Sequence, residues 1–154
     1  MNSTNFEQDL DIAQWFEYLA KVKLIQGNIN NDISFIACMM AKNYLTQRFD
    51  ISQFDVSIKP QGAAGLDIDL ISTDGERIIG EIKTTVPYSK TKNNLGANQK
   101  KAFSNDFDKL NKTPANHKFL FVTDKVTFEV IQSRYSSIIP KVKIVLLSHP
   151  GIYE

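Results

Sequence analysis

The sequence predicts an α/β protein in which a mixed sheet lies between helices. Apolar residues in roughly the first 50 positions recur at helical spacing, whereas from residue 54 onward strand-like runs, alternating or continuous, are interspersed with helical segments. The length of 154 residues, with 42% hydrophobic and 23% charged residues, suits one ordinary globular domain. We therefore expect a single domain over residues 1–154 with the order α-α-β-β-β-α-β-α-β.

Two helices are expected before the first strand. Apolar residues from Phe6 to Val22 fall roughly on one helical stripe, and Gly27 indicates where this helix stops. Asp32 is a suitable N-cap for a second, strongly apolar helix that follows it. The predicted division is an N-terminal helix in residues 1–27 and a core in residues 32–154.

Three strands should follow as an antiparallel meander. Residues 54–60 alternate apolar and polar side chains and end at Pro60. Residues 66–72 alternate in the same way, and the turn sequence STDGE leads into a further strand in residues 77–85. The meander would therefore place the second and third strands side by side.

The remaining elements alternate between helix and strand. Residues 93–112 predict a helix whose apolar side chains, Leu95, Phe103, Phe107 and Leu110, can face the sheet. Residues 118–123 and 142–148 are short continuous apolar runs, typical of strands covered on both faces. A crossover helix is expected between them, in residues 126–138.

Charged residues interrupt the second and third predicted strands. Because strand side chains alternate between faces, Asp67 shares a face with Asp69, and Glu81 shares one with Lys83. If the strands are neighbours, their carboxylates can converge, and carboxylate oxygens are ligands that Mg²⁺ prefers. A lysine beside a ligand glutamate can orient or deprotonate the attacking water, a combination that hydrolyses phosphodiesters. The alternative is a solvated sheet face with ordinary cross-strand ion pairs.

The stretch GLDIDLISTDGERIIGEIKTT resembles the core signature of the PD-(D/E)XK nuclease superfamily, the restriction-endonuclease-like fold. The resemblance implies a three-layer fold with an α-β-β-β-α-β core, here preceded by an extra N-terminal helix. It implies Asp69 as the motif aspartate, with Asp67 as the alternative, and Glu81 and Lys83 as the E-x-K half. The carbonyl of Ile82 would be a further metal ligand. The proline that usually precedes the motif aspartate is absent.

Two weaker similarities extend the resemblance. Many family members carry an acidic residue in the helix before the first core strand, and Asp32 has that place as well as its N-cap role. Some members carry Gln-x-x-x-Tyr on the helix after the E-x-K strand, where this chain has Gln99 and Phe103. The phenylalanine departs from the pattern, which leaves Gln99 and Lys100 as candidate site or phosphate contacts.

The resemblance implies a Mg²⁺-dependent endonuclease, with Mn²⁺ as a substitute, that acts on double-stranded DNA. We expect a small restriction or defence enzyme. The alternatives are a repair or recombination nuclease, such as a Holliday-junction enzyme, and an inactive module that binds DNA or protein. Residues 76–112 carry eight basic and four acidic groups, and this surplus suits a phosphate backbone.

The chain carries no run apolar enough to span a bilayer and no signal-peptide pattern, so a cytoplasmic protein without a membrane partner is expected. Cutting both strands of a duplex usually needs two active sites. A homodimer is therefore one option, with the amphipathic N-terminal helix and Trp15 at its interface. The same helix could instead cover the sheet.

Overall fold

A computed structural model describes residues 12–54, 65–87 and 94–148. The chain divides into two compact units, Met1–Ile33 and Ser34–Glu154. Helix α1, Ile12–Thr46, belongs to both units. No helix in the described ranges is both long enough and apolar enough to cross a membrane.

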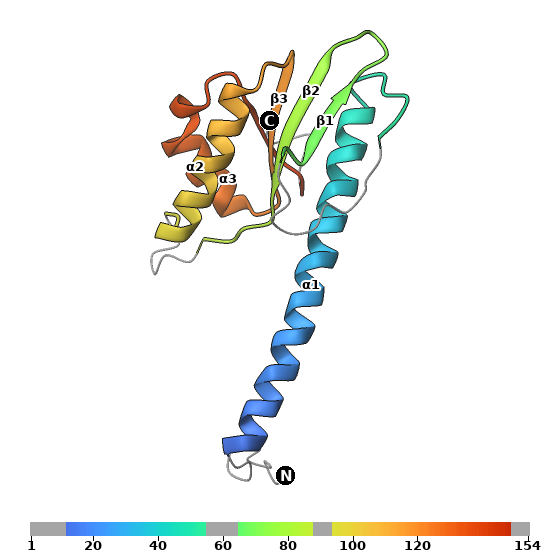
Figure 1. Ribbon diagram of the computed structural model, residues 1–154. Coiled ribbons are helices and arrows are strands. Elements are labelled where there is room, and N and C mark those ends of the chain that lie inside the picture. Colours follow the sequence, from blue (N-terminus) through green and yellow to red (C-terminus); the bar gives the residue numbers. More distant parts are fainter. Residues whose placement is uncertain (1–11, 55–64, 88–93, 149–154) are drawn as a thin grey trace. The chain divides into compact units, whose positions relative to one another are not determined.

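The second unit is built on a four-stranded mixed sheet with the strand order β1-β2-β3-β4 (Figure 1). Its strands are β1, Ile68–Ile71; β2, Arg77–Lys83; β3, His117–Val122; and β4, Lys143–Leu146. The β1–β2 pair is antiparallel, whereas β2–β3 and β3–β4 are parallel. Helix α2, Ala97–Lys112, connects β2 to β3, and helix α3, Lys125–Arg134, with the short 3-10 helix Ser136–Ile138, connects β3 to β4.

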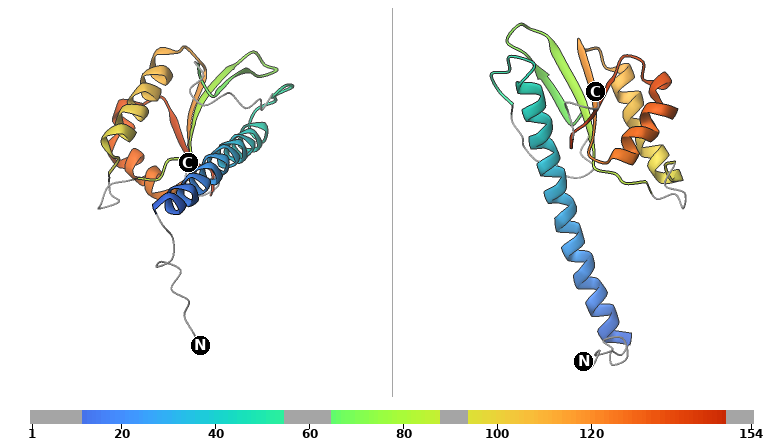
Figure 2. Two further views of the ribbon diagram at one scale, coloured as in Figure 1. Left: turned by 60° about the horizontal axis from the view of Figure 1, so that its bottom comes forward. Right: turned by 180° about the vertical axis from the view of Figure 1, so that it is seen from behind.

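Helices cover both faces of this sheet (Figure 2). On one face, α2 and α3 bury Phe103 and Ile131 against Ile79 and Leu120. On the other face, the C-terminal part of α1 buries Leu45 against strand side chains that include Phe121. The α/β class with a mixed sheet between helices is confirmed, and the continuous apolar run of β3 is buried on both faces as predicted.

A tight turn holds β1 and β2 in register. The Ser72 N–H donates to the Glu76 carbonyl at 2.9 Å, and the Gly75 N–H donates to the Ser72 carbonyl at 3.0 Å. Gly75 has φ +83°, a backbone conformation that residues with a Cβ adopt only at a cost in free energy. The predicted turn is therefore present.

The predicted break between two N-terminal helices is wrong. Residues 27–32 lie inside α1, so Gly27 does not stop a helix and Asp32 does not cap one. Both residues weaken a helix, but each keeps its backbone N–H, and no proline interrupts residues 12–46. The strand predicted in residues 54–60 lies outside the described residues except for Phe54, which packs against the α1 side of the sheet.

Replacing Gly75 with alanine should lower the free energy of unfolding by about 1–2 kcal/mol, because alanine would have to adopt a left-handed conformation. Gly27→Ala is the matched control, since nothing lies within 4 Å of the added Cβ and alanine favours the helix. Urea unfolding measures both effects. Equal stability of Gly75→Ala and wild type would contradict the assigned turn.

Candidate functional site

The register of β1 and β2 brings two carboxyl groups together. Ile68 lies opposite Gly80, so the preceding residue, Asp67, comes opposite Glu81 on the face that α2 covers. The Asp67 carboxylate accepts a hydrogen bond of 2.8 Å from the Ile82 N–H. It also shares a hydrogen bond with the Glu81 carboxyl group. Asp67 is exposed, whereas Glu81 is only 1% exposed. The pair therefore has one buried member and one at the solvent edge.

Helix α2 adds a third carboxylate, which lies against an ammonium group of β2. Asp106 is 4% exposed, and its Oδ2 lies 2.6 Å from Lys83 Nζ. The contact lacks the alignment of a hydrogen bond, so this buried oxygen has an ionic neighbour but no hydrogen-bond donor. Lys83 also lies over the ring of Phe103, 6.0 Å from its centroid.

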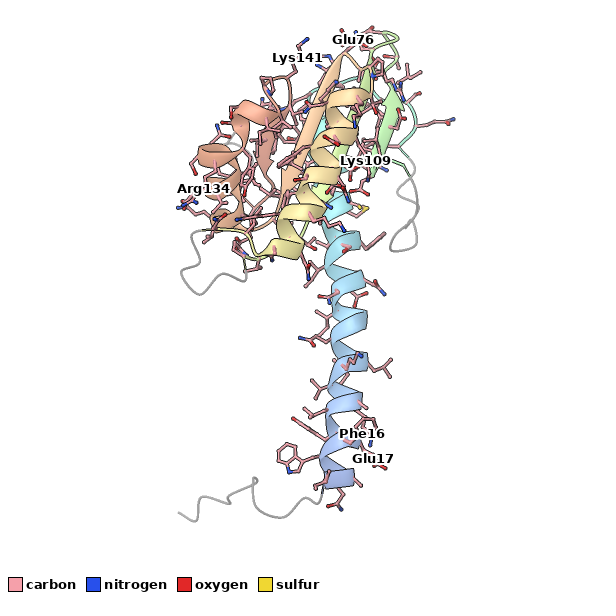
Figure 3. The ribbon with its side chains drawn as sticks, turned by 60° about the vertical axis from the view of Figure 1, so that its left-hand side comes forward. Phe16, Glu17, Glu76, Lys109, Arg134 and Lys141 are labelled. Atoms are coloured by element: carbon pink, nitrogen blue, oxygen red, sulfur yellow. The ribbon has the colours of Figure 1, made fainter. Side chains whose placement is uncertain are left out.

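The ammonium of Lys109 sits among three oxygens, between α2 and the sheet (Figure 3). Its Nζ donates to Glu81 Oε1 at 3.1 Å, to Asp106 Oδ1 at 3.3 Å and to the Gly65 carbonyl at 3.3 Å. The Lys109 side chain is 41% exposed, so it can leave this position toward solvent. The oxygens thus form a partial cage around a cation that the chain itself supplies.

Burial raises the pKa of Glu81 to about 8, and the negative charges of Asp67 and Asp106 add to the effect. The bond from Lys109 opposes the rise but does not cancel it. Burial also acts to lower the pKa of Lys109, yet its bonds to Glu81 and Asp106 outweigh this and raise it. At neutral pH the cluster therefore holds a proton on Glu81 unless further positive charge arrives.

The structure does not bring Asp69 to this cluster. Asp69 lies opposite Ile79, one step along the same face, and forms a bidentate pair with Arg77 at 2.9 and 2.7 Å. Its side chain is 42% exposed. Of the two candidate motif aspartates, Asp67 is therefore the one beside Glu81.

The Gln99 side chain joins the start of α2 to the segment that follows β2. Its side chain accepts from the Gly96 N–H at 2.9 Å and donates to the Val86 carbonyl at 2.7 Å, which fixes the start of α2. Lys100 is exposed on the same helix. Asp32 lies within α1 in the first unit, and residues 88–93 of the basic segment 76–112 lie outside the described residues.

Sequence reasoning missed Asp106 and Lys109 as members of the site. A signal was present, because the buried stripe of α2 runs through Phe103, Phe107 and Leu110, and Asp106 falls on it. An acidic residue at a position that should face the sheet needs a buried partner. Here Lys83 and Lys109 provide it.

The oxygen atoms of this cluster are of the kind that binds a divalent metal ion, but in the part of the chain that the structure describes their present arrangement does not form a metal site. Carboxylate and carbonyl oxygens are the ligand types that hard divalent cations take, and an ammonium already occupies their centre. Among the described residues, however, no three Asp, Glu, His or Cys side chains are arranged to hold a metal ion. A divalent cation would therefore require the Lys109 ammonium to move out.

Comparison with protein-family models, with curated proteins and with solved structures finds no match to this chain.

The metal-free protein should lose stability as the pH rises from about 5 to about 9. The pKa of Glu81 is raised from 4.5 to about 8, so between these values the folded state holds a proton that the unfolded state has lost. The free energy of unfolding should then fall by up to about 1.4 kcal/mol per pH unit because of this group.

Urea unfolding in EDTA at several pH values measures the slope for wild type, Glu81→Gln and the control Asp108→Asn. Asp108 is an exposed residue on the same helix. The Glu81→Gln protein should lack this slope, and Asp108→Asn should keep it. Parallel curves for wild type and Glu81→Gln would contradict the raised pKa.

Proposed function

We propose that this protein is a metal-dependent nuclease of the restriction-endonuclease-like fold that hydrolyses phosphodiester bonds in DNA. The observation that carries the proposal is that Asp67 lies against Glu81 at one end of the β1–β2 pair, with Lys83 two residues along the same face of β2. The sequence resemblance assigns metal and catalytic roles to residues of this stretch, and Asp67 takes the place first given to Asp69. The mixed sheet between helices is compatible with that fold.

Asp67 and Glu81 would hold the cation, together with the carbonyl of Ile82. The position of Asp67 at the solvent edge gives an ion a path to the buried carboxyl group. When bound, Mg²⁺ or Mn²⁺ would supply positive charge that stabilises the charge developing on the phosphate. Glu81 would give up its proton in exchange, because added positive charge lowers the pKa of a neighbouring carboxyl group.

Lys83 would position the attacking water and stabilise negative charge on the phosphate. Its side chain is 21% exposed, and contacts with Asp106 and Phe103 limit its orientations. Asp106 would thus be a positioning residue. Since the Lys109 ammonium is bonded to Glu81 Oε1, an oxygen that would hold the cation, we propose that it moves aside and then faces the phosphate.

DNA is the proposed substrate because the surplus of basic residues surrounds the site in sequence. Lys100 and Lys101 are exposed on α2, the helix that carries Asp106. Contacts of this type position a nucleic acid without reading its bases. Within this class, a restriction or defence enzyme is the first expectation, and a repair or recombination nuclease the second.

Cleavage of plasmid DNA with Mg²⁺ tests the activity. Glu81→Gln, Lys83→Met and Asp67→Asn should each lower the rate by at least about 100-fold, the size of effect typical for a catalytic proton-transfer or electrostatic group. Asp69→Asn should stay within a few-fold of wild type, because the Asp69 carboxylate forms its bidentate pair with Arg77.

The two aspartate variants show which of Asp67 and Asp69 is the motif aspartate. An inactive Asp69→Asn beside an active Asp67→Asn would assign the motif aspartate to Asp69. Discrete fragments would indicate sequence specificity and therefore a restriction enzyme, whereas preferred cutting of branched DNA would indicate a junction nuclease.

Magnesium binding can be measured separately from cleavage. At pH 8.5, Mg²⁺ should raise the melting temperature of wild type, and Lys109→Met should bind it more tightly because an ammonium no longer competes. Lys112→Met is the matched control, since Lys112 pairs with the exposed Asp108 on the same helix. Asp67→Asn should abolish the shift.

The internal ion pairs also support a second candidate, a module that binds DNA without cutting it. The ammonium groups of Lys83 and Lys109 already lie against the carboxyl groups of Asp106 and Glu81, so the chain itself supplies positive charge at this cluster. DNA binding that is retained with no magnesium-dependent melting shift and no cleavage would favour this candidate.

A further inference from the structure

The first part of α1 exposes a row of large apolar side chains. Ile12 is 89% exposed and Leu19 is 58% exposed. The side chain of Phe16, labelled in Figure 3, is 73% exposed beside this row. Such a row on a helix marks a surface that binds another apolar surface.

The row follows the alternating three- and four-residue spacing of a coiled coil. One position of the heptad is filled by Ile12, Leu19 and Ile33, and the other by Trp15, Val22 and Ile29. The helix is uninterrupted over this range, which covers three heptads. A heptad pattern of this length favours helix pairing in a left-handed coil, here called the α1 seam.

A single polar residue in the α1 seam indicates what the partner is. Gln26 takes the first heptad position between Leu19 and Ile33, and it is exposed. In a parallel, in-register pair of identical helices, first positions meet each other, so Gln26 would meet its own copy. Each amide has both donors and an acceptor, and the two can therefore bond to one another.

The antiparallel arrangement lacks this match. There the first heptad position faces the second, so Gln26 would lie against an apolar residue such as Val22 or Ile29 and would lose its hydrogen bonds. In the register that sets Gln26 against Val22, the two copies of Lys23 would also face each other. In the parallel register Lys23 faces Tyr18 instead, with no like charges opposed.

We propose that the α1 seam, residues 12–33, pairs with the same segment of a second copy of this chain, in parallel and in register. Burial of the apolar positions drives the association, and the Gln26 pair selects its orientation and register. The inference is independent of the proposed nuclease activity.

The molar mass of the full chain in solution tests the association. Light scattering after size exclusion should give twice the chain mass of 17.4 kDa. Leu19→Lys and Ile29→Lys place a charge in the α1 seam and should each weaken association by about 100-fold or more. Leu24→Lys is the matched control, because Leu24 is 69% exposed but lies away from the α1 seam and should leave the mass unchanged.

Folding of each variant is checked by the thermal transition of the second unit, followed by near-ultraviolet circular dichroism. A wild-type chain that remains monomeric at about 100 μM would overturn the proposal, since specific protein pairs are usually tighter than this. Equal weakening by Leu24→Lys and Leu19→Lys would also overturn it.

Cross-linking tests the orientation. With Cys38 replaced by serine, a Val22→Cys variant should form a covalent dimer in oxidised glutathione, because equivalent seam positions meet only in the parallel register. Leu24→Cys in the same background should not. A dimer by mass in which Val22→Cys fails to cross-link would overturn the parallel arrangement.

Discussion

The burial of Glu81 beside two other carboxylates constrains the rest of the site. A charged carboxyl group that is 1% exposed lacks the solvation that water would give it. The fold responds by keeping a proton on Glu81, by placing the Lys109 ammonium against it and by pairing Asp106 with Lys83. Both ion pairs, Lys109 with Glu81 and Lys83 with Asp106, join α2 to β2, so the site depends on the packing of α2 against β2.

The same constraint connects the fold to the proposed chemistry. The cluster holds three carboxyl groups but only two ammonium groups, so it can accept a further cation. Hard divalent ions prefer such oxygen ligands. The Lys109 ammonium shows where positive charge is already stabilised, and its exposed side chain can withdraw. A bound cation would exchange a proton on Glu81 for a metal, which links metal affinity to pH.

The sequence was sufficient for the strands that carry the site but not for every residue of the site. Alternating side chains predicted β1, the turn sequence STDGE predicted that β2 follows it, and the continuous apolar run predicted β3. The choice between Asp67 and Asp69 could not follow from alternation, since both residues share one face. Only the strand register separates them, and it depends on the tight turn at Gly75.

Helix signals were the least reliable part of the prediction. Gly27 and Asp32 weaken a helix without removing a backbone hydrogen bond, so α1 continues through both. The contribution of α2 was hidden for a different reason, because Asp106 meets Lys83 only when the helix that connects β2 to β3 packs against the sheet. Long-range packing of this kind leaves only an indirect trace in the sequence, an acidic residue on an apolar stripe.

Carbon-13 NMR of the Glu81 carboxyl group tests most directly whether the cluster is a cation site. In metal-free protein the group should titrate with a pKa of about 8, and saturating Mg²⁺ should lower that pKa and shift its signal. An ordinary glutamate pKa, with a signal that does not respond to Mg²⁺, would contradict both the constraint on Glu81 and the metal site built on it.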